Sequence, residues 1–136
     1  MKEEKIIQYL KNANFWGNEN IYFYTVACEK LSKNESVYDL DVLSIKYYIV
    51  NRNENGIGII PFNELGKSIK NLITFIPNSD IKEVYIEDYK FLFFIPGKKL
   101  IIKTIEDKVI ELEYTGNVNK KNYSLNMYNF LTSFNN

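Results

Sequence analysis

Hydrophobic and polar positions alternate along most of the chain with a period of two, which is typical of β-strands with one buried face. The alternation is clearest over residues 42–50 and 81–87. Other stretches rich in β-branched and aromatic residues, which favour extended structure, lie at 20–31, 56–62, 73–76, 89–95, 100–105 and 109–114. The pattern predicts about seven strands between residues 20 and 115.

Turn residues separate the strand-like stretches. Asn55-Gly56 tolerates positive φ and predicts a hairpin, in which Pro61 ends the second strand or places it at an edge. A second hairpin is predicted near the end of the pattern, where two charged residues at 106 and 107 separate two apolar stretches.

Pro96-Gly97 is a further turn signal, directly after the stretch 89–95. Because short turns connect antiparallel neighbours, we expect a meander over residues 20–115. A meander of this length closes into a barrel or folds into a two-sheet sandwich, since both arrangements remove or cover strand edges.

A period of 3.6, which predicts amphipathic helices, replaces the alternation at both ends of the chain. We assign residues 1–16 to a short N-terminal helix and residues 121–134 to a C-terminal helix that caps the sheets. Their apolar faces are formed by Ile6, Leu10 and Ala13, and by Tyr123, Met127, Phe130, Leu131 and Phe134. The stretch 64–71 is ambiguous, and a short helix there would align Leu65, Ile69 and Leu72.

One segment, Phe91 to Ile95, is apolar at every position. As a strand it would direct Phe91 and Phe93 to one side and Leu92 and Phe94 to the other. A strand with two apolar faces has to be covered on both. We therefore expect one pair to enter the core, and the other to lie beneath a helix or a partner subunit.

The totals indicate one domain, residues 1–136, because 136 residues with 46% hydrophobic content build a single core. The fold class is α+β, mainly antiparallel β. Lys+Arg and Asp+Glu balance at 17 each, so the chain lacks the broad positive field that attracts nucleic acids. No signal peptide is recognisable at residues 1–15, and no run reaches the ~20 apolar residues of a membrane span. We expect a cytoplasmic location.

The composition also limits the chemistry. Histidine is absent and Cys28 is the single cysteine, which excludes Ser-His-Asp triads, His-ligated zinc, cysteine metal cages and internal disulfides. Carboxylates pair in sequence as Glu83 with Glu87 and as Glu111 with Glu113, but the first pair alternates with lysines as on a solvated sheet face. We expect no enzymatic activity, cofactor or metal, and we keep a small hydrolase as the third alternative.

Three segments resemble bacterial pleckstrin-homology-like (PH-like or GRAM-like) domains. IPNSDIKEVYIED is similar to a strand entry of that family, KKLIIKTIEDKVIELEY to one of its hairpins, and NYSLNMYNFLTSF to its capping helix. The resemblance covers roughly residues 20–134 and implies a PH-like barrel or sandwich of about seven strands. It also implies a non-catalytic platform for phosphoinositides, peptides or partner proteins.

The resemblance carries over no binding residue. Lipid-binding members of the family place several lysines and arginines around the first hairpin loop. Here the corresponding loops pair Arg52 with Glu54, and Lys33 with Glu35. Neither loop forms a basic cup for a polyanionic headgroup.

Two groups of side chains are candidate binding residues. A lysine cluster consists of Lys98, Lys99, Lys103, Lys120 and Lys121. An aromatic group consists of Phe15, Trp16 and Tyr48, and such residues are enriched at protein interfaces. We expect a binding or regulatory module whose partner is another protein or a second copy in a homodimer. The alternative is weak peripheral binding of the lysine cluster to an anionic membrane surface, at about 1 kcal/mol per basic residue.

Overall fold

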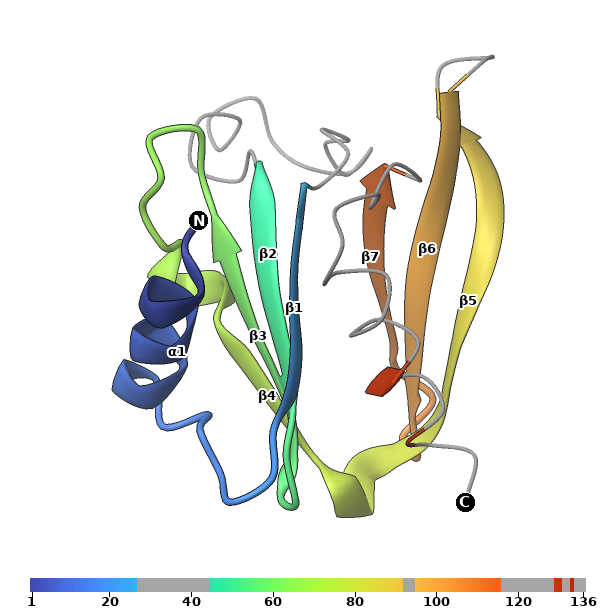
Figure 1. Cartoon of the computed structure of the whole chain (residues 1–136). Helices are drawn as coiled ribbons and strands as arrows, with labels where there is room; N and C mark the ends of the chain where they lie inside the picture. The colour runs from blue at the N-terminus through green and yellow to red at the C-terminus, as the bar shows by residue number, and fades with distance from the viewer. Residues whose placement is uncertain (27–44, 92–94, 116–128, 131–132, 134–136) are drawn as a thin grey trace.

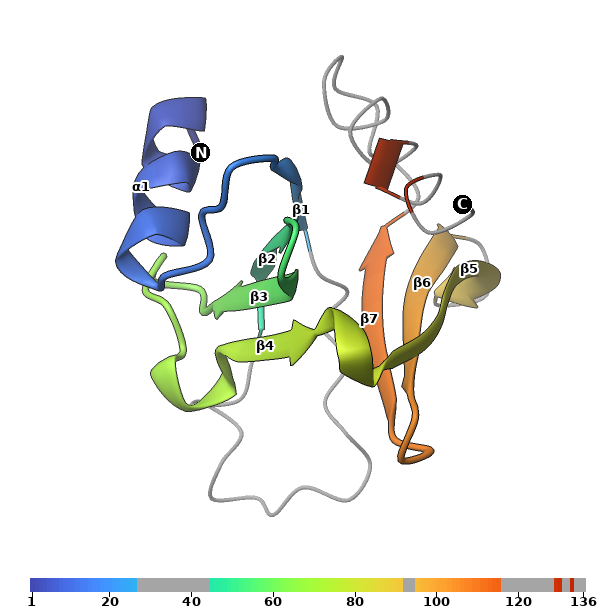
Figure 2. The same cartoon turned by 90° about the horizontal axis from the view of Figure 1, so that it is seen from below.

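The structure, a computed structural model, describes residues 1–26, 45–91, 95–115, 129–130 and 133. Figures 1 and 2 show three layers, with helix α1 on one side of a four-stranded sheet and a three-stranded sheet on the other side. Both sheets are antiparallel, and the strands of each follow one another in chain order. The predicted α+β class and the meander are therefore confirmed.

The four-stranded sheet, sheet A, contains β1 (Ile21–Val26), β2 (Tyr47–Arg52), β3 (Gly56–Phe62) and β4 (Thr74–Pro77). The three-stranded sheet, sheet B, contains β5 (Ile81–Phe91), β6 (Ile95–Thr104) and β7 (Val109–Thr115). Helix α1 spans Glu3–Asn12, and short 3-10 turns lie at Lys70–Leu72 (η2) and Asn78–Asp80 (η3). Within the described residues the two sheets form a sandwich and not a closed barrel.

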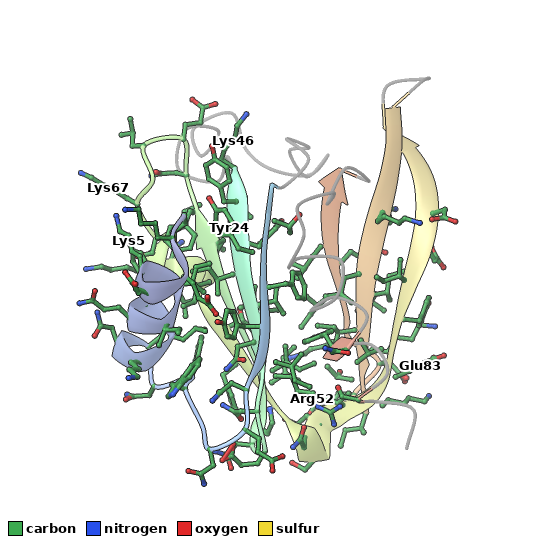
Figure 3. The ribbon with its side chains drawn as sticks, viewed as in Figure 1. Lys5, Tyr24, Lys46, Arg52, Lys67 and Glu83 are labelled. Atoms are coloured by element: carbon green, nitrogen blue, oxygen red, sulfur yellow. The ribbon has the colours of Figure 1, made fainter. Side chains whose placement is uncertain are left out.

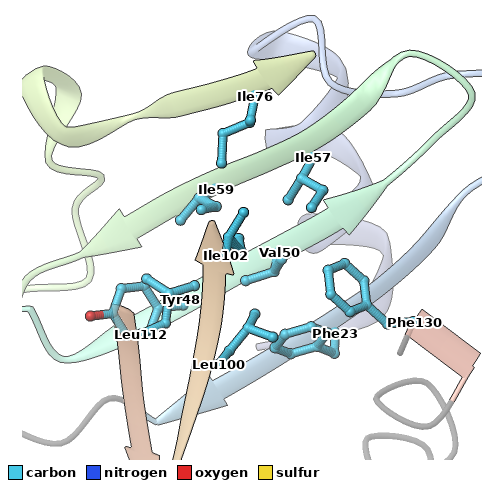
Figure 4. Packing of buried hydrophobic residues seen from close by; sticks show 10 residues of the cluster. All are labelled: Phe23, Tyr48, Val50, Ile57, Ile59, Ile76, Leu100, Ile102, Leu112 and Phe130. Atoms are coloured by element: carbon cyan, nitrogen blue, oxygen red, sulfur yellow. The ribbon is translucent and has the colours of Figure 1, made fainter. Parts of the chain in front are cut away.

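The main core lies between the two sheets (Figure 4). Alternate residues of sheet A and sheet B meet there, because successive side chains of a strand point to opposite faces. From the C-terminal region Phe130 enters the same cluster, where its ring meets that of Phe23 edge-on at 5.3 Å between centroids. The members of the cluster are Phe23, Tyr48, Val50, Ile57, Ile59, Ile76, Leu100, Ile102, Leu112 and Phe130.

A second core fills the space between sheet A and helix α1. Its buried members are Ile6, Leu10, Phe15, Ile49, Ile60 and Phe62. Sheet A is thus covered on both faces, and β2 and β3 are buried at nearly every position. Gly58 of β3 lies directly under Phe15, and a Cβ atom added there would come within 2.4 Å of the ring.

The predicted turn at Pro96-Gly97 is wrong. Both residues lie inside β6, where Pro96 pairs with Lys90 and Gly97 pairs with Tyr89. Proline is tolerated at this point because the described pairing of β7 with β6 begins at Gly97, so Pro96 has a neighbouring strand on one side only among the residues that the structure places. The single strand predicted over residues 89–95 is also wrong, since Phe91 ends β5, Ile95 begins β6 and these two residues pair with each other. What covers the two apolar faces depends on residues 92–94, which lie outside the described residues.

The stretch 64–71, whose pattern is ambiguous, does not form an α-helix, and only the 3-10 turn η2 lies near it. The side chain of Asn63 explains the difference, because its Oδ1 accepts hydrogen bonds from the backbone N–H groups of Leu65 (3.0 Å) and Lys67 (3.1 Å). An asparagine that binds the backbone two residues ahead favours a turn over a helix. Leu65, which a helix would align with Ile69 and Leu72, is 80% exposed.

Of the two predicted terminal helices, the first is confirmed as α1. The second, at 121–134, falls mostly outside the described residues. Asn129 and Phe130 are helical, and the N–H of Ser133 donates to the carbonyl oxygen of Asn129 at 3.1 Å. Arg52, at the end of β2, donates to the Ser133 hydroxyl and so connects sheet A to the C-terminal region.

Candidate functional site

Four aromatic side chains form a half-buried strip on the outer face of sheet A, beside helix α1. We call this surface the aromatic strip, and it consists of Trp16, Tyr22, Tyr24 and Tyr47. The rings of Tyr24 and Tyr47 stack at 5.5 Å between centroids with an interplanar angle of 18°. The rings of Trp16 and Tyr22 lie 5.8 Å apart. Figure 3 shows Tyr24 on this face, on the opposite side of the molecule from Glu83 of β5.

Strand register explains the composition of the strip. Tyr22 and Tyr24 are two residues apart on β1 and therefore share a face. Tyr24 pairs with Ile49, so Tyr47 lies diagonally opposite Tyr24 on the same face, within reach of an aromatic ring. The alternate residues Phe23 and Tyr48 point into the main core instead.

Helix α1 contributes two charged side chains to the border of the strip. The hydroxyl of Tyr22 donates to the Oε1 atom of Glu3, in the first turn of the helix. The Nζ atom of Lys11, in the last turn, lies 5.9 Å from the centre of the Trp16 ring, which is a cation–π distance. The strip is therefore bordered by one anion and one cation.

A network of buried asparagines fixes the loop that carries Trp16. The Nδ2 atoms of Asn51 and Asn53 both donate to the carbonyl oxygen of Phe15, at 2.7 and 2.8 Å. The Nδ2 atom of Asn51 also lies 3.0 Å from the Oδ1 atom of Asn20, which accepts from the N–H of Gly17 at 2.8 Å. Trp16 is thus held between anchored neighbours, and its ring is positioned before any partner binds.

The same loop is closed by Glu54. Its carboxylate accepts backbone hydrogen bonds from Asn18 at 2.7 Å and from Glu19 at 3.3 Å. Gly17 permits this approach, because a Cβ atom there would come within 2.1 Å of the carboxylate. The pKa of the Glu54 carboxyl is lowered mainly by the hydrogen bond from the backbone of Asn18. A hydrogen bond from the backbone of Glu54 itself lowers it further.

Replacing Glu54 by glutamine should lower the thermal unfolding midpoint near neutral pH and have less effect in acid. A carboxyl whose pKa is lowered on folding stabilises the protein above its unfolded pKa of about 4.3, and this contribution is lost as the pH falls through the folded value. Thermal unfolding of E54Q and the parent chain between about pH 7 and pH 3 measures the difference. The control is E64Q, at an exposed position. A gap between E54Q and the parent that is constant with pH would contradict the account.

The aromatic residues predicted from the sequence do not form one patch. Phe15 is buried against helix α1 at 7% exposure, and Trp16 belongs to the strip on the same side. Tyr48 is also 7% exposed, but it lies in the main core on the opposite face of sheet A. Its sequence neighbour Tyr47 takes the surface position that sequence reasoning gave to Tyr48.

The described part of the lysine cluster is divided between two faces of β6. Lys99 and Lys103 share the outer face of sheet B, whereas Lys98 points to the opposite face. Each is close to a carboxylate, and Lys98 pairs with Asp88. The Nζ atom of Lys99 is 3.8 Å from Glu111, and that of Lys103 is 4.0 Å from Glu83. Lys120 and Lys121 lie outside the described residues.

The carboxylates considered for acid–base chemistry belong to this mixed-charge face. Glu83 and Glu111 expose 55% and 48% of their side chains, respectively. The pKa of Lys103 is raised, mainly by a hydrogen bond with the side chain of Tyr85. No group of three or more potential metal-ligating side chains occurs among the residues that the structure places. A hollow of about 230 Å³ lies on the surface of α1, lined by Lys5, Gln8, Tyr9 and Asn12.

No family model, curated protein or solved structure matches this chain. Within the described ranges, no helix is long and apolar enough to cross a membrane. The surfaces of the molecule are therefore the basis for a functional proposal.

Proposed function

We propose that this chain is a non-catalytic binding module that contacts another protein through the aromatic strip. The observation that carries the proposal is that Trp16, Tyr22, Tyr24 and Tyr47 remain half-exposed on one face of sheet A. Tyrosine and tryptophan dominate the energetics of protein interfaces, because they bring a large apolar area and a polar tip. Their rings are fixed by stacking and by the asparagine network, so little side-chain entropy is lost on binding.

Membrane binding through the lysine cluster has less support. The three described lysines of the cluster each have a carboxylate within 4.0 Å, and they point to both faces of β6. Nearby carboxylates reduce the attraction of lysines to anionic lipids, which is only about 1 kcal/mol per basic residue. A hydrolase also has less support, because exposed carboxylates among lysines lack the low-dielectric cleft that raises a catalytic pKa.

The resemblance to PH-like domains is part of the same proposal. It is supported by the succession of a four-stranded and a three-stranded antiparallel sheet and by the C-terminal residue Phe130, which packs into the core between them. A PH-like platform that acts in the cytoplasm would use such a fold to present a rigid binding surface. The single cysteine, Cys28, is compatible with a reducing compartment.

Site-specific photo-crosslinking tests the proposal. The photoreactive residue p-benzoylphenylalanine replaces Tyr24 in the strip, or Tyr85 on the outer face of sheet B as a control, and intact cells that express the chain are irradiated. Both tyrosines are half-buried, so the two probes are matched in exposure. We expect a discrete protein adduct from position 24 that is absent from position 85. No adduct at position 24, or the same adducts from both positions, would contradict the proposal.

A further inference from the structure

One row of helix α1 extends the aromatic strip. Glu3, Ile7 and Lys11 follow one another at intervals of four residues, and side chains at this spacing lie on the same flank of a helix. The contacts of Glu3 with Tyr22 and of Lys11 with Trp16 show that this flank faces the strip. Ile7, midway between the two charges, is half-buried. The row therefore presents an anion, an apolar centre and a cation.

We propose that the partner of this surface is a second copy of the same chain, bound about a twofold axis that passes near Ile7. This inference rests on the proposed function of the strip. A twofold axis perpendicular to α1 makes the two helices antiparallel. The first residue of the row in one copy then lies opposite the last residue of the row in the other copy. Glu3 then lies opposite Lys11 of the second copy, Lys11 lies opposite Glu3, and the two Ile7 side chains meet on the axis.

Charge complementarity favours this occupant over others. The row carries one negative and one positive charge at its two ends, about 12 Å apart along the helix, so its net charge is zero. A uniformly acidic or basic partner would meet one like charge, whereas a twofold-related copy meets an opposite charge at both ends. Figure 2 shows α1 as the outer layer beside sheet A. Glu3 and Lys11 are exposed and Ile7 is half-buried, so a second helix can approach the row.

Cysteine crosslinking tests the position of the axis. Ile7→Cys is introduced into a Cys28→Ser background, which leaves one thiol per chain. A thiol near a twofold axis lies close to its own copy, so mild oxidation should give a covalent dimer. The control is Asn12→Cys in the same background, because Asn12 lines the hollow with Lys5 and Gln8, outside the Glu3–Ile7–Lys11 row. We expect at least about fivefold more dimer from position 7, since the dimer raises the local thiol concentration there. Equal crosslinking at both positions would overturn the proposed axis.

Charge exchange tests the pairing independently. Light scattering over a range of concentrations should show reversible dimers of the parent chain. Glu3→Lys and Lys11→Glu each place like charges together at both ends of the row and should raise the dissociation constant about tenfold. The double variant E3K/K11E restores opposite charges and should return the constant to near the parent value. Single and double variants that dimerise equally would contradict the pairing, and circular dichroism confirms that each variant is folded.

The outcomes separate this inference from the proposed function. If the parent chain is monomeric at all concentrations while the photo-crosslink from position 24 captures a different protein, the second-copy inference is wrong and the proposed function stands. If neither a dimer nor any adduct forms, both are wrong. An adduct with twice the mass of the chain, together with the crosslink at position 7, supports both.

Discussion

Replacing Phe130 by alanine should destabilise the protein by about 3–5 kcal/mol, the usual loss when a fully buried phenylalanine is truncated. Phe130 is 0% exposed and packs edge-on against Phe23, in the cluster that joins the two sheets. The change removes the buried area of the ring and leaves a cavity that the surrounding strands of both sheets fill only in part. This loss is a large share of the 5–15 kcal/mol that stabilises an ordinary domain.

Urea unfolding of F130A against the parent chain measures the loss. The control is L65A, because Leu65 is 80% exposed and its truncation should change the free energy of unfolding by less than about 0.5 kcal/mol. The conservative variant F130L should fall between the two, since leucine fills part of the cavity. If F130A unfolds at the same urea concentration as L65A, the C-terminal region does not contribute to the core.

Sequence patterns predicted the local elements well where a short-range cause controls them. The hairpin of β2 and β3 forms where it was predicted, and the side chain of Asn53 stabilises its turn by accepting hydrogen bonds from the N–H groups of Asn55 and Gly56. The N-terminal helix follows from the spacing of Ile6 and Leu10, both of which are buried. Pro61 lies in β3 beyond Ile59, where pairing with β4 ends, as a residue without an N–H group requires.

The errors came from signals that tertiary structure overrides. Proline and glycine at 96 and 97 indicate a turn in isolation, but β6 continues through both residues and pairs with β5 there. The apolar spacing over 64–71 fits a helix, but the side chain of Asn63 stabilises a turn. Neither competing interaction can be read from hydrophobic periodicity.

The candidate site was missed for a related reason. Residues 47–50 are apolar or aromatic at every position, so a period of two defines two faces without saying which one is the surface. Helix α1 covers Ile49 fully and leaves Tyr47 and Tyr24 half-exposed, while sheet B covers Tyr48. The choice between Tyr47 and Tyr48 therefore depends on long-range packing. The presence of an aromatic surface was predictable from the number of tyrosines, but of the four members of the strip only Trp16 was predicted.

Replacing Asn51 by aspartate should be as damaging as removing a core aromatic residue, although the two side chains have nearly the same shape. Asn51 is 0% exposed, and its Nδ2 atom donates to the carbonyl oxygen of Phe15 and lies 3.0 Å from the Oδ1 atom of Asn20. In the variant a buried carboxylate oxygen faces these two oxygens, which disfavour its negative charge. An uncompensated buried charge costs about 3–5 kcal/mol.

The penalty of N51D should depend on pH in a defined direction. Burial and the facing oxygens raise the folded pKa of the new carboxyl above its unfolded value of about 3.9. The variant is therefore least stable, relative to the parent, above the folded pKa, and it recovers as the pH falls and the carboxyl is protonated. A protonated carboxyl can also donate a hydrogen bond to the carbonyl oxygen of Phe15, which replaces part of what the amide supplied.

Chemical unfolding of N51D and the parent chain at several pH values measures both the size and the sign of this effect. The matched control is N63D, because the side chain of Asn63 acts as an acceptor for two backbone N–H groups, a role that a carboxylate fulfils equally well. Its free energy of unfolding should stay within about 0.5 kcal/mol of the parent value. If N51D is as stable as N63D at neutral pH, the asparagine network does not hold the loop that carries Trp16. The aromatic strip would then lack the fixed geometry on which its proposed role in binding depends.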